Sequence, residues 1–555
     1  MMDGTEGNHI DWPLRPWILA ALLGAAGLLV WTFADKGNDV PWRMAATAFV
    51  FFGAIAAAFT IERDNWKQPL VFALVVGLVM AGLAWRAVSA GDHYAVPQYG
   101  FIAGVISTGL ALPLFQSGFH RTRFATPYQA VHYNVWSDAL SAGGSMVFVG
   151  ASWLVLLVLA ALFELLKIRF LFDLMDDGWF AWTFSGVAFG AALGILRGQL
   201  KILGTLQAVV MTVLSVLAVP LALGLVLFLV AMIVSGPEVL WQATQSATPI
   251  LLACAAGSWV LANAILRDSD TEMSGNPVLR WASIALAAAI LPLTVFAAIS
   301  LGTRISQHGL SPERIWGLIA IAVACAYGLA WLVALLRGWK GGWGERLRRA
   351  NLHLAAVICV FAFILALPIL DFGRIAAGNQ LQRLARGHVS PEDFDYTALR
   401  WDFGDAGREA LARLAKNKDA KVAELAAAAL AQKERAYSGF VGKNKTRADF
   451  NLRVQPDDAE IREGVLDYLV THPYDCEDRC VVLDLGEASG GGRRLALVRG
   501  SGYTLMNLKP GTGLEPEELG AIELPTLGPD SVVEVGEGRV IRIDGKVVGP
   551  AIGDN

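Results

Sequence analysis

Eleven long apolar stretches crowd the first 370 residues of this 555-residue chain. None contains Asp, Glu, Lys or Arg, and each is long enough to cross a bilayer as a helix, which takes roughly 17–25 residues. Backbone groups in hydrocarbon must be paired within their own segment, so these stretches have to be helical. The sequence therefore predicts an all-α polytopic membrane bundle of about eleven transmembrane helices. The stretches are Trp17–Phe33, Met44–Ile61, Pro69–Trp85, Gln98–Phe115, Leu140–Phe163, Trp179–Leu196, Thr205–Val234, Thr248–Leu266, Trp281–Leu301, Ile315–Leu336 and Leu352–Leu370.

The lack of charge inside these stretches bears on function. Ion-coupled transporters and intramembrane enzymes usually keep ionisable groups at membrane depth. This pattern disfavours both classes.

The charged residues define a second part of the chain. Residues 371–555 hold 54 of the 94 charged side chains, 24 basic and 30 acidic. This tail is long enough to bury a core of its own, and it lacks the basic patch of a nucleic-acid surface. We expect a cytoplasmic N-terminus at 1–16, a membrane domain at 17–370, a helical segment at 371–436 and a small β-rich domain at 437–555.

Basic residues near the membrane predict the orientation. The N-terminus and the short loops on its side of the membrane hold fourteen Lys and Arg, and the short loops on the other side hold seven. Short loops rich in Lys and Arg stay in the cytoplasm. Eleven crossings then place the tail in the periplasm, and a single miscounted span would reverse that placement.

The densest basic segment is Arg337–Asn351, where only Glu345 opposes five cations. Each such charge near an anionic leaflet is worth about 1 kcal/mol. We expect this loop to set the topology of the last spans and of the tail. Its basic residues are Arg337, Lys340, Arg346, Arg348 and Arg349.

Cys476 and Cys480 are the only cysteines of the tail. Disulfides persist in oxidising compartments, so this close pair is interpreted as a periplasmic disulfide. Two reduced thiols in a cytoplasmic tail are the alternative. A structural zinc site needs four ligands, and only His472 lies nearby. We predict no metal site and no cofactor.

Two polar segments adjoin the spans. Glu164–Gly178 alternates apolar and charged residues, which is typical of an interfacial helix. Its acidic residues could gather a divalent cation at the outer surface, although a solvated acidic lip is the more common arrangement. His120–Asp138 is expected to lie along the lipid headgroups, with interfacial rather than metal-binding histidines. The acidic cluster comprises Glu164, Asp173, Asp176 and Asp177.

Small residues recur in the sixth span as Gly186, Gly190 and Gly194. This spacing lets two helix backbones approach closely. A hinge or broken helix at a substrate site is the alternative. Without charged groups beside these glycines, packing is the favoured interpretation.

The tail begins with helical patterns and ends with strand patterns. Ser390 followed by Pro391 predicts a helix start, and Asp544-Gly545 between two apolar arms predicts a hairpin. We expect the β-rich end to be antiparallel. The expected helices are Arg374–Arg386, Asp405–Lys416, Asp419–Arg435 and Asp457–Thr471, and the expected strands lie in Val481–Leu485, Arg494–Val498, Tyr503–Asn507, Ala521–Leu524, Ser531–Val535 and Val540–Val548.

The sequence around the end of the last span reads Leu-Pro-Ile-Leu-Asp-Phe-Gly-Arg-Ile-Ala from Leu367, and Gly-His-Val-Ser-Pro-Glu-Asp-Phe-Asp-Tyr from Gly387. It resembles the bacterial family catalogued as domain of unknown function 4153, which has large polytopic inner-membrane proteins with a soluble C-terminal part. The resemblance extends from residue 17 to about residue 435. It implies a bacterial envelope location and supplies no catalytic residues. Candidate headgroup, glycan or partner contacts in this segment are Arg374, Asp395, Tyr396 and Arg400.

Three functions remain open. The first is a non-enzymatic inner-membrane protein that presents a periplasmic interaction domain to a protein or an envelope glycan. The second is a transporter or a lipid- or glycan-handling protein. The third, with the lowest weight, is an envelope-modifying enzyme whose site lies at the outer membrane surface. Membrane lipids are the one partner class common to all three.

Overall fold

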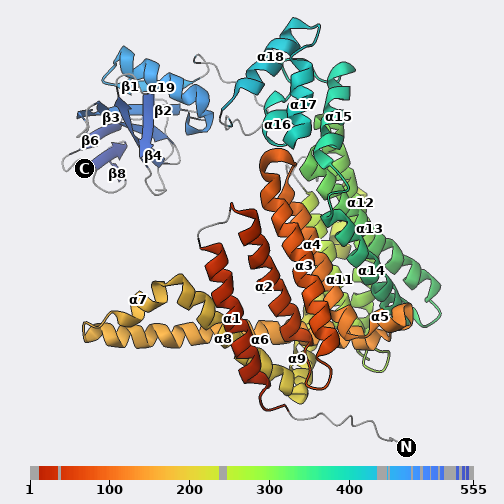
Figure 1. Ribbon diagram of the computed structural model, residues 1–555. Helices are drawn as coiled ribbons and strands as arrows, with labels where there is room; N and C mark the ends of the chain where they lie inside the picture. The colour runs from red at the N-terminus through yellow and green to blue at the C-terminus, as the bar shows by residue number, and fades with distance from the viewer. Residues whose placement is uncertain are drawn as a thin grey trace, which may run out of the picture. The chain divides into compact units, whose positions relative to one another are not determined.

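The structure is a computed structural model, and its chain divides into two compact units (Figure 1). The first comprises Met1–His388 and Asp402–Ala410, and the second comprises Val389–Trp401 and Leu411–Asn555. The residues described are 12–35, 39–236, 247–433, 435, 447, 450–476, 479–487, 492–499, 502–509, 513–517, 533–536, 540–543 and 546–548.

Eleven helices in the described part of the chain are long and apolar enough to cross a membrane, as the sequence predicts. The chain is therefore a multi-pass membrane protein with an α-helical body and an α+β end. The eleven are α1 (Arg15–Ala34), α2 (Pro41–Thr60), α3 (Lys67–Ala90), α4 (Pro97–Gln116), α6 (Tyr128–Leu165), α8 (Gly178–Gly198), α9 (Leu200–Ser235), α11 (Thr248–Leu266), α12 (Pro277–His308), α13 (Pro312–Arg337) and α14 (Trp343–Ala366).

The segment His120–Asp138 differs from the expectation of a surface segment. After the short helix α5 (Phe119–Thr122) and a 3-10 turn, α6 begins at Tyr128, twelve residues before the apolar stretch. His132, Ser137, Ser141 and Ser145 are all buried along α6. Their spacing of four or five residues places them on one helix face. These polar residues face the protein interior, so polarity does not mark the start of the span.

The expected interfacial helix at Glu164–Gly178 is divided in two. The helix α6 continues through Leu165, and Lys167 adopts a positive φ of 60°. A seven-residue helix, α7 (Phe170–Asp176), follows. The left-handed backbone at Lys167 ends the first helix because a helical run cannot continue through it.

The glycines of α8 lie directly against the backbone of α1. A Cβ atom added at Gly190 would lie 2.2 Å from the carbonyl oxygen of Leu19, and one added at Gly186 would lie 2.2 Å from that of Leu23. The pairing of higher residue numbers on α8 with lower numbers on α1 makes the two helices antiparallel. The geometry agrees with close helix packing as the purpose of the glycine spacing.

The helix ends gather at two opposite faces of the first unit. At the N-terminal face, where α1 begins, the side chain of Arg197 at the end of α8 donates to the carbonyl of Ala58 near the end of α2. At the other face, the helix α15 (Phe372–Ala385) lies against the end of α12, since Arg383 donates to the carbonyl of Ser306. Figure 1 shows α1 beginning at the lower end of the bundle and α15 at the upper end, so we name the second face the α15 face.

The helical part of the tail is close to the prediction, with one correction. Its helices are α16 (Tyr396–Trp401), α17 (Gly404–Leu414) and α18 (Ala420–Ala431). Ser390 does not start a helix: its hydroxyl accepts the backbone N–H of Asp393 and closes a turn. Helix α16 begins six residues later, where the carboxylate of Asp395 accepts the N–H of Ala398.

Within its described residues, the β-rich end has a five-stranded sheet in the order β1-β2-β3-β4-β5 and a three-stranded sheet in the order β6-β7-β8. The expectation of a purely antiparallel domain is wrong at β1, which pairs in parallel with β2. A parallel neighbour needs a crossover connection, and α19 (Ala459–Thr471) supplies it. The strands are β1 (Asn451–Gln455), β2 (Arg479–Glu487), β3 (Arg493–Arg499), β4 (Gly502–Lys509), β5 (Gly513–Glu517), β6 (Val533–Gly536), β7 (Val540–Ile543) and β8 (Lys546–Val548).

The two strands of the predicted terminal hairpin are confirmed, because Ile543 of β7 pairs with Lys546 of β8 in antiparallel register. Its turn residues and the strand expected at Ala521–Leu524 lie outside the described residues. Strands β1 and β5 are absent from the sequence-based expectation.

Candidate functional site

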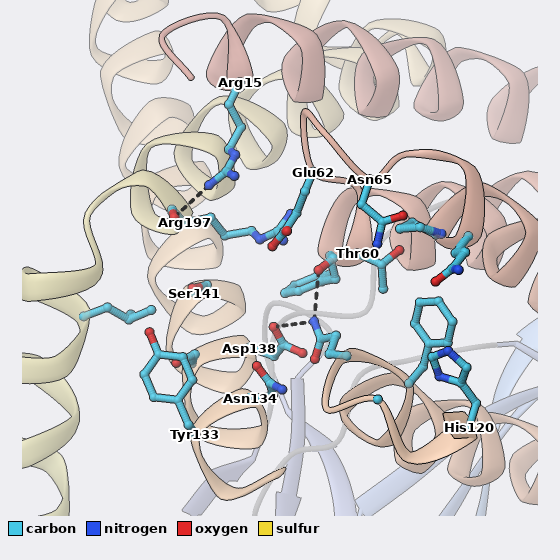
Figure 2. Close-up of a pocket in the computed structure, with 18 of the residues that line it drawn as sticks. Arg15, Thr60, Glu62, Asn65, His120, Tyr133, Asn134, Asp138, Ser141 and Arg197 are labelled. Carbon is cyan, nitrogen blue, oxygen red and sulfur yellow. Dashed lines mark hydrogen bonds between the residues drawn. The ribbon is translucent and has the colours of Figure 1, made fainter. Parts of the chain in front are cut away.

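A polar cavity of about 280 Å³ opens at the N-terminal face of the membrane body (Figure 2). Its walls come from the start of α1, the ends of α2, α4 and α8, and the first turns of α6. We call it the α6 cavity. It is lined by Arg15, Phe59, Thr60, Glu62, Asn65, Gln68, Pro69, Phe115, Gln116, Gly118, His120, Arg121, Tyr133, Asn134, Ser137, Asp138, Ser141, Arg197 and Leu203.

Asp138 places a carboxylate in this cavity. One of its oxygens accepts the side-chain amide of Gln116 at 3.2 Å (Figure 2). The other oxygen is buried and has no hydrogen-bond partner. The apolar membrane stretch of α6 starts two residues later, so the carboxylate lies at the edge of the membrane region.

Two arginines occupy another part of the cavity wall. Arg197 Nη1 donates to the carbonyl of Ala58 at 2.6 Å, and Arg15 Nη1 donates to the carbonyl of Arg197 at 2.8 Å. Figure 2 shows both guanidinium groups on the side of the cavity where Glu62 lies, with Asp138 farther along it. These two cations are held by neutral carbonyls, and neither forms an ion pair with Asp138 or Glu62.

Several buried polar atoms around the cavity lack a partner. They are the Nε of Arg15, the Oε1 of Gln116, the hydroxyls of Ser137 and Ser141, and the Oδ2 of Asp138. Buried polar groups in folded proteins are nearly always hydrogen-bonded, so a group of unpaired ones needs an explanation. All five atoms belong to residues that line this one cavity, which marks it as the candidate site.

A second polar cluster, between α6, α11, α13 and α14, is fully satisfied. The side-chain oxygen of Asn351 accepts the indole N–H of Trp331 at 3.0 Å and that of Trp259 at 3.3 Å. Its amide donates to Asn263 at 2.7 Å and to the hydroxyl of Tyr128 at 3.4 Å. The buried amide joins four helices and serves packing.

A second cavity, of about 660 Å³, lies beside this cluster, and Arg348 and Asp270 line it. The guanidinium of Arg348 donates to the carbonyl of Leu266 at 2.9 Å and pairs with Asp270. This cavity is more open and its lining cation is already paired, so the α6 cavity is the better candidate site.

The five basic residues predicted to set the topology do not share one loop. Helix α13 ends at Arg337 and α14 begins at Trp343, so Arg346, Arg348 and Arg349 lie on α14. Arg348 is buried, with 4 % of its surface exposed. Arg349 pairs with Glu345 one helical turn away, at 2.9 Å. All five lie at the N-terminal face, and their effect on topology stays a prediction.

The acidic residues that the sequence predicted at the outer surface are exposed around α7. Glu164 lies 3.8 Å from Arg169, and Asp177 accepts the indole N–H of Trp179 at 3.3 Å. Asp173 and Asp176 lie on α7 itself. Across the described ranges, no group of three or more His, Cys, Asp or Glu side chains is placed to hold a metal ion.

The four predicted contact residues serve local structure. Arg374, in the first unit, lies 3.6 Å from Asp371. In the second unit, Asp395 caps α16 and Arg400 lies over the ring of Trp401. Tyr396 is buried, and burial is the main reason that its pKa is raised. Ligand contact by these residues stays a prediction.

Cys476 and Cys480 lie at disulfide distance, with their Cα atoms 5.7 Å apart. Both are buried in the core of the β domain, where they contact residues of β1, β2 and α19. The pairing supports the predicted disulfide.

The α6 cavity was not predicted from the sequence. Asp138 and Arg197 each lie just outside an apolar stretch, so each reads as an ordinary flanking charge. The one available signal is the spacing of Ser137, Ser141 and Ser145, which continues the inner face of α6 into the membrane stretch.

An eleven-span helical body with a polar cavity at one face and an α+β tail defines a polytopic membrane protein. The family described as domain of unknown function (DUF4153) matches residues 46–414. The match covers more than half of the chain, so the protein belongs to this family. No curated protein and no solved structure shows a match to it.

Proposed function

We propose that this protein is a bacterial inner-membrane protein whose membrane body holds an interaction domain in the periplasm. The observation that carries the proposal is the attachment of the start of the tail to the α15 face. Gln380 Nε2 donates to the carbonyls of His308 and Leu310, both at 2.9 Å. Arg383 donates to the carbonyls of Ser306 and Gln307 at 2.7 and 2.6 Å. A fixed base is what a displayed domain needs.

A second attachment holds residues 402–410 to the same face. The carboxylate of Asp405 lies 2.7 Å from the imidazole of His93, between α3 and α4. Arg408 donates to the carbonyl of Asp92 at 2.7 Å. The chain is therefore held at two points before it continues into the rest of the tail.

The orientation rests on charge. The N-terminal face carries the majority of the basic residues that flank the spans, and such residues favour the cytoplasmic side. The α15 face, opposite to it, then lies in the periplasm. A disulfide between Cys476 and Cys480 suits that compartment.

Reporter fusions test the orientation. Alkaline phosphatase fused after Asn555 should be active, and the same enzyme inserted at Gly275, between α11 and α12 on the N-terminal face, should be inactive. The reverse pattern would contradict the periplasmic tail. Replacing Arg346 and Arg349 with Glu should leave a fraction of tails in the cytoplasm, measured by protease digestion of spheroplasts.

Site-specific photo-crosslinking in cells tests the display of an interaction domain. A photoreactive residue at Val470, an exposed apolar position on α19 (44 % exposed), should form a specific adduct with a periplasmic protein or glycan. The control is Trp339, which is 70 % exposed at the N-terminal face. Adducts from Trp339 alone would refute the interaction role of the tail.

A further inference from the structure

The α6 cavity keeps opposite charges apart in a place where pairing is expected. Asp138 and the two arginines line one cavity, yet in the described part of the chain the carboxylate forms no ion pair with either guanidinium. Charges withdrawn from water are costly unless they are paired and hydrogen-bonded. Glu62 lies on the side of the two arginines and offsets one of their charges, so one net positive charge remains there and one negative charge lies at Asp138. A bound molecule that carries both signs would satisfy the two sides at once.

The lining side chains indicate which charge of a ligand each part of the cavity would hold. Near Asp138 they carry acceptors or hydroxyls: the carboxylate of Asp138, the side-chain amide of Gln116, and the hydroxyls of Ser137 and Ser141. This set suits a group with several N–H donors, such as a primary ammonium. At the other side, Arg15 and Arg197 line the cavity, and guanidinium groups match phosphate well.

We propose that the α6 cavity binds a phosphoethanolamine group, with its ammonium against Asp138 and its phosphate against Arg15 and Arg197. The volume of about 280 Å³ lies near the lower end of the roughly 300–1,000 Å³ of small-ligand pockets, which suits a headgroup-sized ligand. The cavity lies where the spans end, and this is the depth of lipid headgroups. The group belongs to a phospholipid or to a free soluble molecule.

This inference goes beyond the display of a tail domain and does not depend on the orientation of the tail. Its test uses the full chain purified in detergent. Native mass spectrometry measures binding of short-chain phosphatidylethanolamine, phosphatidylcholine and phosphatidylglycerol at equal concentrations. Phosphatidylcholine has the same charges without N–H donors, and phosphatidylglycerol lacks the cation.

We expect phosphatidylethanolamine to bind at least about tenfold more tightly than the other two, because a hydrogen bond to a charged group is worth a tenfold factor or more. Free phosphoethanolamine added as a competitor distinguishes the sources. If it displaces the lipid at similar concentrations, the headgroup alone is recognised. If the lipid stays bound, its acyl chains contribute and the ligand is the phospholipid.

The substitution Asp138→Asn removes the charge and keeps the shape and the bond to Gln116. It should abolish the preference for phosphatidylethanolamine and leave the melting temperature unchanged or higher. The matched control is Asp173→Asn, an exposed carboxylate on α7, which should change neither. The double substitution Ser137→Ala and Ser141→Ala, which removes two unpaired hydroxyls, should lower the preference several-fold without loss of stability.

Equal binding of the three lipids by the wild-type chain would overturn the proposal and indicate a water-filled cavity. A preference that persists both in Asp138→Asn and in the serine double variant would overturn it as well, since the lipid would then bind elsewhere.

Discussion

The imidazole Nδ1 of His93 lies 2.7 Å from a carboxylate oxygen of Asp405, although 312 positions separate them in the chain. The other oxygen of Asp405 accepts Arg408 Nη2 at 2.6 Å. Gly404, with a φ of +64°, brings the backbone against the carbonyl of His93, where a Cβ atom would lie only 2.5 Å away. The tail thus returns to the connection between α3 and α4 before it continues to α18.

This contact should weaken in acid. The hydrogen bonds from Arg408 and then from His93 lower the pKa of Asp405. A carboxylate with a lowered pKa stabilises the fold above its unfolded pKa, and that contribution is lost as pH falls through the lowered value. Hydrogen exchange of residues 402–410, corrected for the intrinsic rate, should rise in this acidic window. The variant Asp405→Asn should show fast exchange already at neutral pH, and an acid response that persists in it would assign the effect to another group.

Arg383→Ala should destabilise the attachment of α15 by about 2 kcal/mol, the size expected for hydrogen bonds from a charged donor. Its guanidinium satisfies carbonyls at the end of α12, where the helix dipole also favours a cation. The matched control is Arg386→Ala, which replaces the exposed arginine that directly follows α15. Thermal unfolding of the purified chain measures both, and equal effects would argue against the α12 contact as the cause.

Gly190→Ala should destabilise the contact between α1 and α8 by about 1–3 kcal/mol, the usual cost of overpacking. The added methyl would lie 2.2 Å from a backbone oxygen of Leu19, which cannot rotate away. Gly150→Ala on α6 is the control, because nothing lies within 4 Å of its Cβ position. Helix propensity should make that variant neutral or slightly stabilising. Equal melting temperatures for the two variants would argue against close packing of α8 on α1.

Asn351→Leu should cost several kcal/mol, because it leaves the indole N–H groups of Trp331 and Trp259 and the side-chain oxygen of Asn263 buried without this partner. Each unsatisfied group costs about 1–3 kcal/mol. Adding Trp331→Phe removes one of the unsatisfied donors, the indole N–H of Trp331. The double variant should therefore lose less than the sum of the two single variants, as measured in a double-mutant cycle by chemical unfolding.

The disulfide prediction concerns Cys476 and Cys480 in cells. The three other cysteines, Cys254, Cys325 and Cys359, are partly accessible and should first be replaced by alanine. Because Cys476 and Cys480 are buried, whole cells are first denatured in acid, which traps the thiols. Alkylation of the denatured protein should then add no label before reduction and two labels after it. Cys476→Ser should lower the stability of the β domain by about 2 kcal/mol, the loop-closure value for so short a ring. Two labels without reduction would show free thiols.

The membrane architecture follows from local sequence. Apolar length without charge identifies each span, because hydrocarbon forces the backbone into helices whatever the neighbours are. The glycine spacing of α8 likewise predicts close packing from one helix alone. The turn residues after Val540 predict the last hairpin, since adjacent antiparallel strands depend on local geometry.

The features that the sequence could not determine depend on contacts between elements that are distant in the chain. The first turns of α6 read as a surface segment, because polar residues on one helix face look the same whether they meet water or the polar ends of other helices. Strand β1 pairs in parallel with β2 only because α19 folds back over the sheet, and this arrangement depends on tertiary packing. The α6 cavity joins Asp138 to Arg15 and Arg197 from three helices. Each residue reads as a flanking charge by itself, and only the packing of α1, α6 and α8 brings the three together around one space.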